Sequence, residues 1–157
     1  MATLGVETST LDQIDMRLLA LLNTNGRMPV TELARHLGLS KTPCAARMKR
    51  LVEQGYILGF QAVLNPAKLD RSHVAFVEVR LRDTTETALQ AFNTAVQDIA
   101  EVEQCHMIAG SFDYLLKVRT KDIAAYRRVL GERISALPHV ASSSTHVAME
   151  AVKENGV

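Results

Sequence analysis

The stretch that decides the fold of the first half of the chain is Leu39–Leu51, LSKTPCAARMKRL. Read as a helix, it begins at Ser40, whose hydroxyl is placed to cap a free N–H of the first turn. Pro43 falls within that turn, where its missing N–H breaks no helical bond. Apolar residues recur at i, i+4 and i+7 and line one buried face: Cys44, Met48 and Leu51. At about 100° per residue, the residues expected on the outward face are Thr42, Ala46, Lys49 and Arg50.

The segment just before this helix gives it a partner. A short apolar stripe at helical spacing ends at Gly38 and comprises Val30, Leu33, Ala34 and Leu37. A helix with one apolar and one basic face is also typical of an ordinary solvated surface helix. A helix, a tight glycine turn and a basic helix in succession indicate instead a helix-turn-helix motif, which reads a DNA major groove.

Charge supports the DNA-binding interpretation. Between Arg27 and Arg50 there are six basic residues and one acidic residue, so this segment carries 6 − 1 = +5, whereas the whole chain carries only +1. Such a concentration favours a nucleic-acid partner. Phosphate contacts are expected from Arg27, Arg35, Lys49 and Arg50. Base-edge contacts are expected from Lys41, Thr42, Ala46 and Arg47, with Ser40 and Pro43 completing the interface in the first turn.

Composition bounds the class of protein. The 157 residues are 47% hydrophobic and 22% charged, which is typical of a globular protein, and no apolar run suggests a membrane span or a signal peptide. The spacing of Cys44 and Cys105 matches no zinc module, so we expect free thiols in a reducing cytoplasm. We expect no metal, no cofactor and no membrane partner.

Residues 1–10 are expected to form a flexible tail, and residues 11–65 a DNA-binding domain. Thr10 and Gln13 fit a capping box that opens a first helix. The second helix has two competing starts, Pro29 in its first turn or Thr31 as its cap. Residues 56–64 are rich in β-formers and predict a short strand, followed by a linker at 66–72.

From His73 the apolar period changes to two, and the remaining elements read β-α-β-β-α-β over residues 73–157. This order predicts a split-βαβ, ferredoxin-like sheet with both helices on one face. The other face is then uncovered, with many apolar candidates on it, which favours self-association. The fold class expected for the whole chain is α+β.

Three stretches, LSKTPC at 39–44, GSFDYLL at 110–116 and VAME at 147–150, resemble the Lrp/AsnC family of bacterial regulators, and the likeness runs from about Leu11 to Asn155. The resemblance implies an N-terminal winged helix-turn-helix and a C-terminal ligand-sensing domain of the RAM or ACT type. It also implies homodimers that assemble into octamers or similar discs, and a small amino-acid effector, which is leucine or another amino acid. The sequence departs from the family pattern at Lys41, Ala46 and His146, so the operator and the effector stay open.

The resemblance also implies an effector region, which comprises Met107, Gly110, Ser111, Asp113, Ile123, His146 and Val147. Asp113 is able to accept the ammonium group of an amino acid, and Gly110 allows a close approach of backbone. Asp113 is equally a turn residue that bonds its own backbone.

We therefore predict a DNA-binding transcriptional regulator of amino-acid metabolism rather than an enzyme. One alternative is an enzyme similar to the siroheme decarboxylases, which share this two-domain plan, with His106 and His146 as acid and base of a tetrapyrrole pocket. The basic recognition helix argues against it, because a catalytic relative has no need of one. The other alternative is a ligand sensor that binds no DNA.

Overall fold

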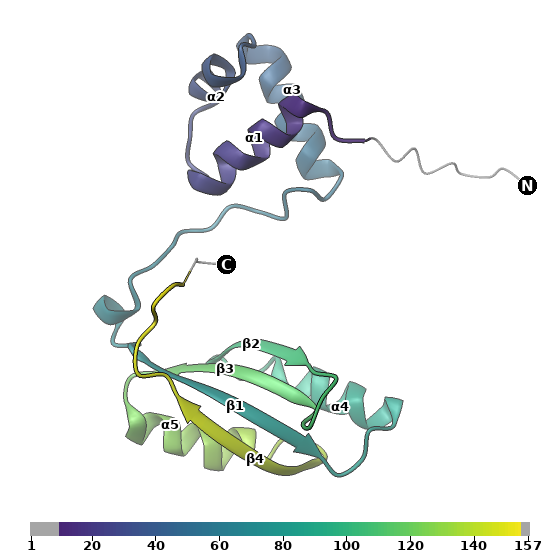
Figure 1. Ribbon diagram of the computed structural model, residues 1–157, viewed down its shortest axis with the longest axis vertical. Coiled ribbons are helices and arrows are strands. Elements are labelled where there is room, and N and C mark those ends of the chain that lie inside the picture. The colour runs from purple at the N-terminus through teal and green to yellow at the C-terminus, as the bar shows by residue number, and fades with distance from the viewer. Residues whose placement is uncertain (1–9, 155–157) are drawn as a thin grey trace, which may run out of the picture. The chain divides into compact units, whose positions relative to one another are not determined.

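The computed structural model describes residues 10–154 (Figure 1), so the prediction for residues 1–9 lies outside the described residues. The chain divides into two compact units, with the change from one to the other between Val63 and Leu64. No helix within the described range is long and apolar enough to cross a membrane.

The first unit is a bundle of three helices: α1 (Gln13–Thr24), α2 (Val30–Leu37) and α3 (Lys41–Glu53). Their apolar stripes meet in one buried cluster, which contains Leu18, Leu22, Leu33, Ala34, Leu37, Cys44 and Leu51. Gly38 turns the chain between α2 and α3 with φ +68°, a left-handed conformation that glycine adopts without strain. The helix-turn-helix prediction is confirmed.

The predicted helix starts need correction. Asp12, not Thr10, caps α1: its carboxylate accepts the N–H of Asp15 at 2.7 Å, and the carboxylate of Asp15 accepts the N–H of Asp12 at 3.1 Å. Ionised carboxylates are stronger acceptors than a hydroxyl or an amide, so this reciprocal pair displaces the predicted one. Ser40 holds the N-cap position of α3 but makes no side-chain capping bond, and α2 starts after Pro29.

The strand predicted at residues 56–64 is absent. Residues 58–64 pair with no strand in the described part of the chain, and large apolar side chains among them are exposed: Leu58 by 97%, Val63 by 80%. A strand needs a neighbour to pair with, and the described residues supply none there. A short 3-10 helix, η1 (Pro66–Leu69), follows and is capped by Asn65.

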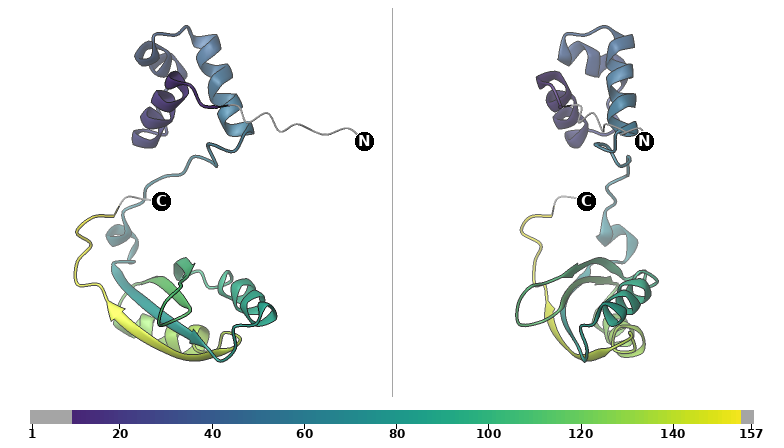
Figure 2. Two further views of the ribbon diagram at one scale, coloured as in Figure 1. Left: turned by 45° about the vertical axis from the view of Figure 1, so that its right-hand side comes forward. Right: turned by 90° about the vertical axis from the view of Figure 1, so that its right-hand side faces the viewer.

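The second unit is a four-stranded antiparallel sheet with two helices packed on one face (Figures 1 and 2). Its elements are β1 (His73–Leu81), α4 (Glu86–Val96), β2 (Val102–Met107), β3 (Tyr114–Thr120), α5 (Ile123–Val129), a π-helical turn η2 (Leu130–Ile134) and β4 (Val140–Val147). The strand order β2-β3-β1-β4 is that of a split-βαβ sheet, so the ferredoxin-like prediction is confirmed. The core between sheet and helices contains Val77, Val79, Phe92, Tyr114, Leu116, Tyr126 and Ile134.

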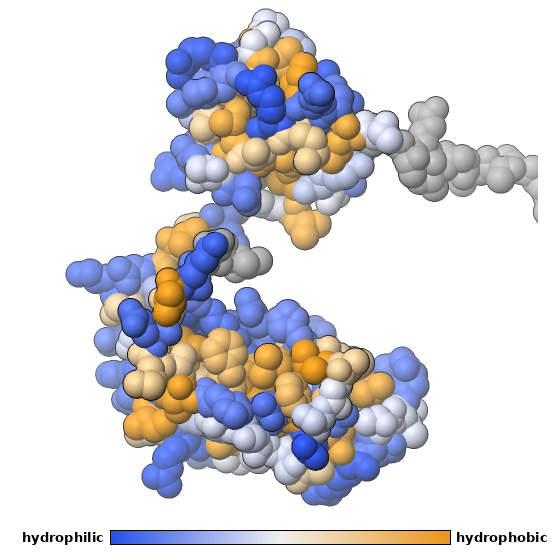
Figure 3. All heavy atoms as spheres, viewed as in Figure 1, coloured by the Kyte–Doolittle hydropathy of each residue, from blue (hydrophilic) through white to orange (hydrophobic). Residues whose placement is uncertain are grey.

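The face of the sheet away from the helices is less apolar than predicted. Figure 3 shows hydrophobic and hydrophilic side chains mixed over it. On β1, Phe76 is followed by Glu78 and Arg80, and the outward positions of β3 include Lys117 and Arg119. The segment after β4 returns to this face, where Glu154 accepts hydrogen bonds from Lys117 and Arg119.

Candidate nucleic-acid interface and effector region

The outward face of α3 carries three predicted DNA-contacting residues at i, i+4 and i+7. Thr42, Ala46 and Lys49 lie at the surface along this face and form what we call the outward stripe. Lys41 and Pro43 are exposed in the same first turn. Lys49 lies 3.6 Å from Glu53, and both side chains are solvated, so this ion pair restrains the lysine little. The outward stripe is therefore available to a partner outside the chain.

Arg47 and Arg50 differ from the outward stripe because their side chains reach α1, although that of Arg50 stays 39% exposed. Nη1 of Arg47 lies 2.9 Å from Oδ1 of Asp15 and 2.5 Å from Oδ2 of Asp12, and Nη2 of Arg50 lies 2.6 Å from Oδ2 of Asp15. Asp15 is only 1% exposed. A buried carboxylate needs charged partners, and these two guanidinium groups supply them. Both arginines thus hold α3 against α1.

The same contacts affect titration. The backbone N–H of Asp15, followed by the side chain of Arg47, holds the pKa of Asp12 below its usual value. The hydrogen bonds to Asp12 and Asp15 raise the pKa of Arg47 above its usual value. The sequence contains a signal for this arrangement that the apolar periods alone do not reveal: two carboxylates at i and i+3 opening one helix, and two arginines at i and i+3 in another.

The remaining predicted phosphate contacts are exposed. Arg27 lies in the connection between α1 and α2, and Arg35 lies on α2, 3.9 Å from Glu32. Arg17, which no sequence motif marks, donates to the backbone oxygen of His36 at 2.8 Å and so ties α1 to α2.

Four of the predicted effector residues lie at or beside the β2–β3 connection. We call Met107, Gly110, Ser111 and Asp113 the hairpin group. The carboxylate of Asp113 accepts the N–H of Leu81 on β1 at 2.7 Å, and its own N–H donates to the oxygen of Val79 at 2.9 Å. Asp113 therefore bonds the backbone of β1. The sequence suggested two other partners, the ammonium group of an effector and the backbone of its own turn.

The other three, Ile123, His146 and Val147, form a second group at the opposite end of the sheet. His146 pairs with Phe76 on β1, whereas Asp113 contacts Leu81. Five residues of strand separate these two β1 positions, which is about 16 Å at about 3.3 Å per residue. One chain therefore does not bring all seven residues together. Ile123, at the start of α5, follows the end of β3 that pairs with His73.

The histidines of the enzyme alternative are also apart. His106 lies on β2 and His146 on β4, the two edges of the sheet, and three strand spacings amount to about 14 Å. Nε2 of His146 lies 3.2 Å from a carboxylate oxygen of Glu78. Within residues 10–154, no group of three His, Cys, Asp or Glu side chains is placed to hold a metal ion.

Both cysteines are free thiols, as predicted. Cys44 is buried in the first core, and Cys105 is half-buried on β2. Burial raises the pKa of the Cys105 thiol to about 11, so its reactive thiolate is scarce at neutral pH.

Comparison with known proteins agrees with this architecture. Residues 11–52 match the AsnC-type helix-turn-helix domain, and residues 74–157 match the Lrp/AsnC ligand binding domain. The chain is 62% identical to a proline dehydrogenase transcriptional activator of Rhizobium radiobacter, over 96% of this chain and 97% of the relative. It is 46% identical to the leucine-responsive regulatory protein of Escherichia coli K12, over 92% and 88% of the two chains.

Two solved structures have the same fold. An AsnC family transcriptional regulator from Agrobacterium tumefaciens superposes with a TM-score of 0.87 at 32% identity, and a transcriptional regulator from Neisseria meningitidis in complex with L-Met with a TM-score of 0.87 at 28%. Each alignment covers 92% of this chain and 94% of the other. With a helix-turn-helix unit, a split-βαβ sheet and full-length relatives of one kind, the chain belongs to the Lrp/AsnC family of DNA-binding transcriptional regulators.

Proposed function

We propose that this regulator controls a gene of proline catabolism and that L-proline is its effector. The observation that carries the proposal is its identity to two proteins named proline dehydrogenase transcriptional activator, 62% to that of Rhizobium radiobacter and 58% to that of Rhodobacter capsulatus. Both alignments cover more than nine tenths of each chain. The leucine-responsive relative is 46% identical.

DNA reading is assigned to the outward stripe. Thr42 and Ala46 are small enough for α3 to approach base edges closely, and Lys49 reaches phosphates farther along the groove. Three further exposed cations supply phosphate contacts: Arg27, Arg35 and Lys41. Arg47 and Arg50 contribute indirectly, because their contacts with Asp15 hold α3 in its orientation.

The functional species is a homodimer or a larger ring of dimers, such as an octamer. A dimer is required to place two recognition helices about 34 Å apart on one face of a duplex. The exposed apolar side chains of residues 58–64 support this assembly, because a segment of β-formers outside any sheet pairs readily with a copy of itself.

The effector site is built from two chains. The hairpin group of one copy and the Ile123, His146 and Val147 group of another lie at opposite ends of each sheet, so a twofold contact between sheets brings them together. An amino acid bound there changes how the copies associate and affects DNA affinity through assembly. The protein acts in the cytoplasm as a regulator, without catalysis or a cofactor.

The test is a thermal-shift screen of the full-length protein against the twenty common amino acids, followed by calorimetric titration. L-proline is expected to raise the melting temperature most, because a ligand that binds only the folded state stabilises it. A larger shift with another amino acid refutes the choice of proline. A second measurement, absorbance with added tetrapyrrole, tests the enzyme alternative, since a bound tetrapyrrole changes its visible spectrum.

A further inference from the structure

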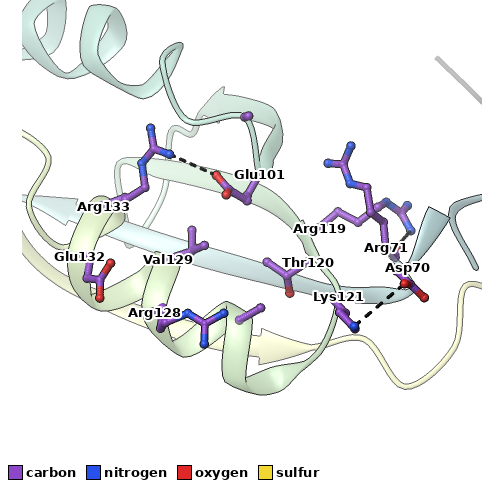
Figure 4. Close-up of a pocket in the computed structure, with 12 residues that line it drawn as sticks. Asp70, Arg71, Glu101, Arg119, Thr120, Lys121, Arg128, Val129, Glu132 and Arg133 are labelled. Atoms are coloured by element: carbon purple, nitrogen blue, oxygen red, sulfur yellow. Dashed lines mark hydrogen bonds and ion pairs between the residues drawn. The ribbon is translucent and has the colours of Figure 1, made fainter.

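A pocket of about 510 Å³ lies at the end of the sheet where η1 leads into β1 (Figure 4). It is bounded by α5 and η2, by the end of β3, and by Ala100 and Glu101 just before β2. We call it the α5 pocket. Its volume lies within the range of small-molecule sites. It contains none of the residues assigned above to DNA or to the amino-acid effector.

The walls of the α5 pocket are rich in cations. The lining contains five basic and three acidic side chains, so its net charge is 5 − 3 = +2. The basic residues are Arg71, Arg119, Lys121, Arg128 and Arg133, and the acidic residues are Asp70, Glu101 and Glu132. In a protein of net charge +1, this is a local excess of positive charge.

Most of these cations are not held by their acidic neighbours. Lys121 lies 4.0 Å from Asp70, and Arg133 lies 3.6 Å from Glu101, both too long for a hydrogen bond. Arg128 is exposed and has no polar partner within residues 10–154. Arg119 differs, because Glu103 and Glu154 neutralise it. Nη2 of Arg133 donates to the backbone oxygen of Asp98 at 2.8 Å, so only its Nη1 side is lightly engaged. The pocket thus offers Lys121, Arg128 and one edge of the Arg133 guanidinium to a ligand.

These cations approach the pocket from different sides. In Figure 4, Arg133 and Glu101 lie on one side, Lys121 and Asp70 lie on the other, and Arg128 lies below. A planar carboxylate is satisfied by one guanidinium fork. A tetrahedral phosphate group presents oxygens in several directions, which suits separate donors placed around it.

We propose that the α5 pocket binds a small phosphorylated anion, at a site distinct from that of the amino-acid effector. The π-helical turn η2 contributes Glu132 and Arg133 to the site, and such turns are frequent at functional positions. Asp70 and Arg71 come from the connection between η1 and β1, within the second unit, so a bound anion also restrains this connection.

The test is calorimetric titration of inorganic pyrophosphate, with orthophosphate as the smaller probe, into the full-length protein at constant ionic strength. Arg128→Gln is the main variant, because Arg128 supports no other side chain and its loss leaves the fold intact. Arg127→Gln is the matched control: its arginine is the adjacent residue of α5, is exposed and does not line the pocket. Lys121→Gln is the second pocket variant.

We expect one pyrophosphate per chain, bound about tenfold more weakly by Arg128→Gln and by Lys121→Gln, each of which loses one charge-assisted contact. Arg127→Gln is expected to bind like the wild type. Equal losses in Arg127→Gln and Arg128→Gln indicate unspecific charge attraction and overturn the proposal, as does the absence of binding to the wild type. Weaker operator binding by Arg128→Gln also overturns it, because the cations then serve DNA phosphates. Proline affinity is measured in the same pocket variants and is expected to be unchanged. The outcome for pyrophosphate is then independent of whether proline is the effector.

Discussion

Replacing Asp15 by asparagine removes the negative charge that joins α1 to α3. The asparagine keeps the size of the side chain and an oxygen acceptor, so the change isolates the charge. Arg47 retains Asp12 as a partner in this variant, whereas Arg50 loses the carboxylate 2.6 Å from its Nη2. The helix start also weakens, because the Asp15 carboxylate accepts the N–H of Asp12.

The magnitude follows from burial. Breaking a fully buried ion pair by removing one partner costs about 3–5 kcal/mol. Here the carboxylate is buried, but the arginine side chains are 26% and 39% exposed and regain water. We therefore expect a loss of about 2–3 kcal/mol in the free energy of unfolding of the first unit. For a unit of this size that is a fall in melting temperature on the order of 10 °C.

The assay is urea unfolding of the full-length protein, combined with amide hydrogen exchange to locate the change. Amide exchange is expected to be faster in α1 and α3 of the variant than in the wild type, and to be unchanged in the sheet of the second unit. Glu53→Gln is the control, because it removes only the exposed ion pair with Lys49 and is expected to change stability by less than about 0.5 kcal/mol. If Asp15→Asn and Glu53→Gln are equally stable, the buried carboxylate does not hold the recognition helix.

Three further predictions concern single side chains. Lys49→Gln is expected to lower the slope of log K against log salt for operator binding by about 0.9 without loss of stability, and an unchanged slope in fluorescence anisotropy excludes a phosphate contact. Asp113→Ala leaves the N–H of Leu81 without its acceptor and is expected to cost about 1–3 kcal/mol, seen as faster exchange of that amide; an unaltered rate contradicts the hydrogen bond. The hydrogen bond from Lys117 holds the pKa of Glu154 below its usual value of 4.5. The ionised Glu154 therefore stabilises the fold above pH 4.5, and this stabilisation is lost as the pH falls through the lowered pKa. In acid unfolding, Glu154→Gln is expected to lack this pH-dependent loss of stability, and identical acid-unfolding curves for variant and wild type rule it out.

Elements with a strong apolar period could be predicted from the sequence. The stripe of Cys44, Met48 and Leu51 predicted α3, and the alternation after His73 predicted β1, because burial of one face fixes both patterns. The β-α-β-β-α-β order then left few sheet topologies. Each of these helices and strands is therefore indicated by the spacing of apolar residues within its own short segment.

Features that depend on contacts distant in sequence could not be predicted in this way. The role of Arg50 is set by Asp15, 35 residues earlier, and that of Asp113 by Leu81 on another strand. Residues 58–64 show the opposite failure, since their composition predicts a strand but no described segment of the chain pairs with them. The seven effector residues came from family likeness, and the structure of one chain separates them into two groups.

The division of labour along α3 has a consequence for how related regulators diverge. The side chains that fasten the helix, Arg47 and Arg50, contact Asp12 and Asp15, whereas those of the outward stripe lie at the surface. If the outward stripe reads DNA as proposed, substitutions at Thr42, Ala46 or Lys49 change the groups offered to DNA at little cost in stability. After a gene duplication, one copy is free to acquire a new operator through these positions while its scaffold stays intact, which is a simple route to a large family of regulators on one fold.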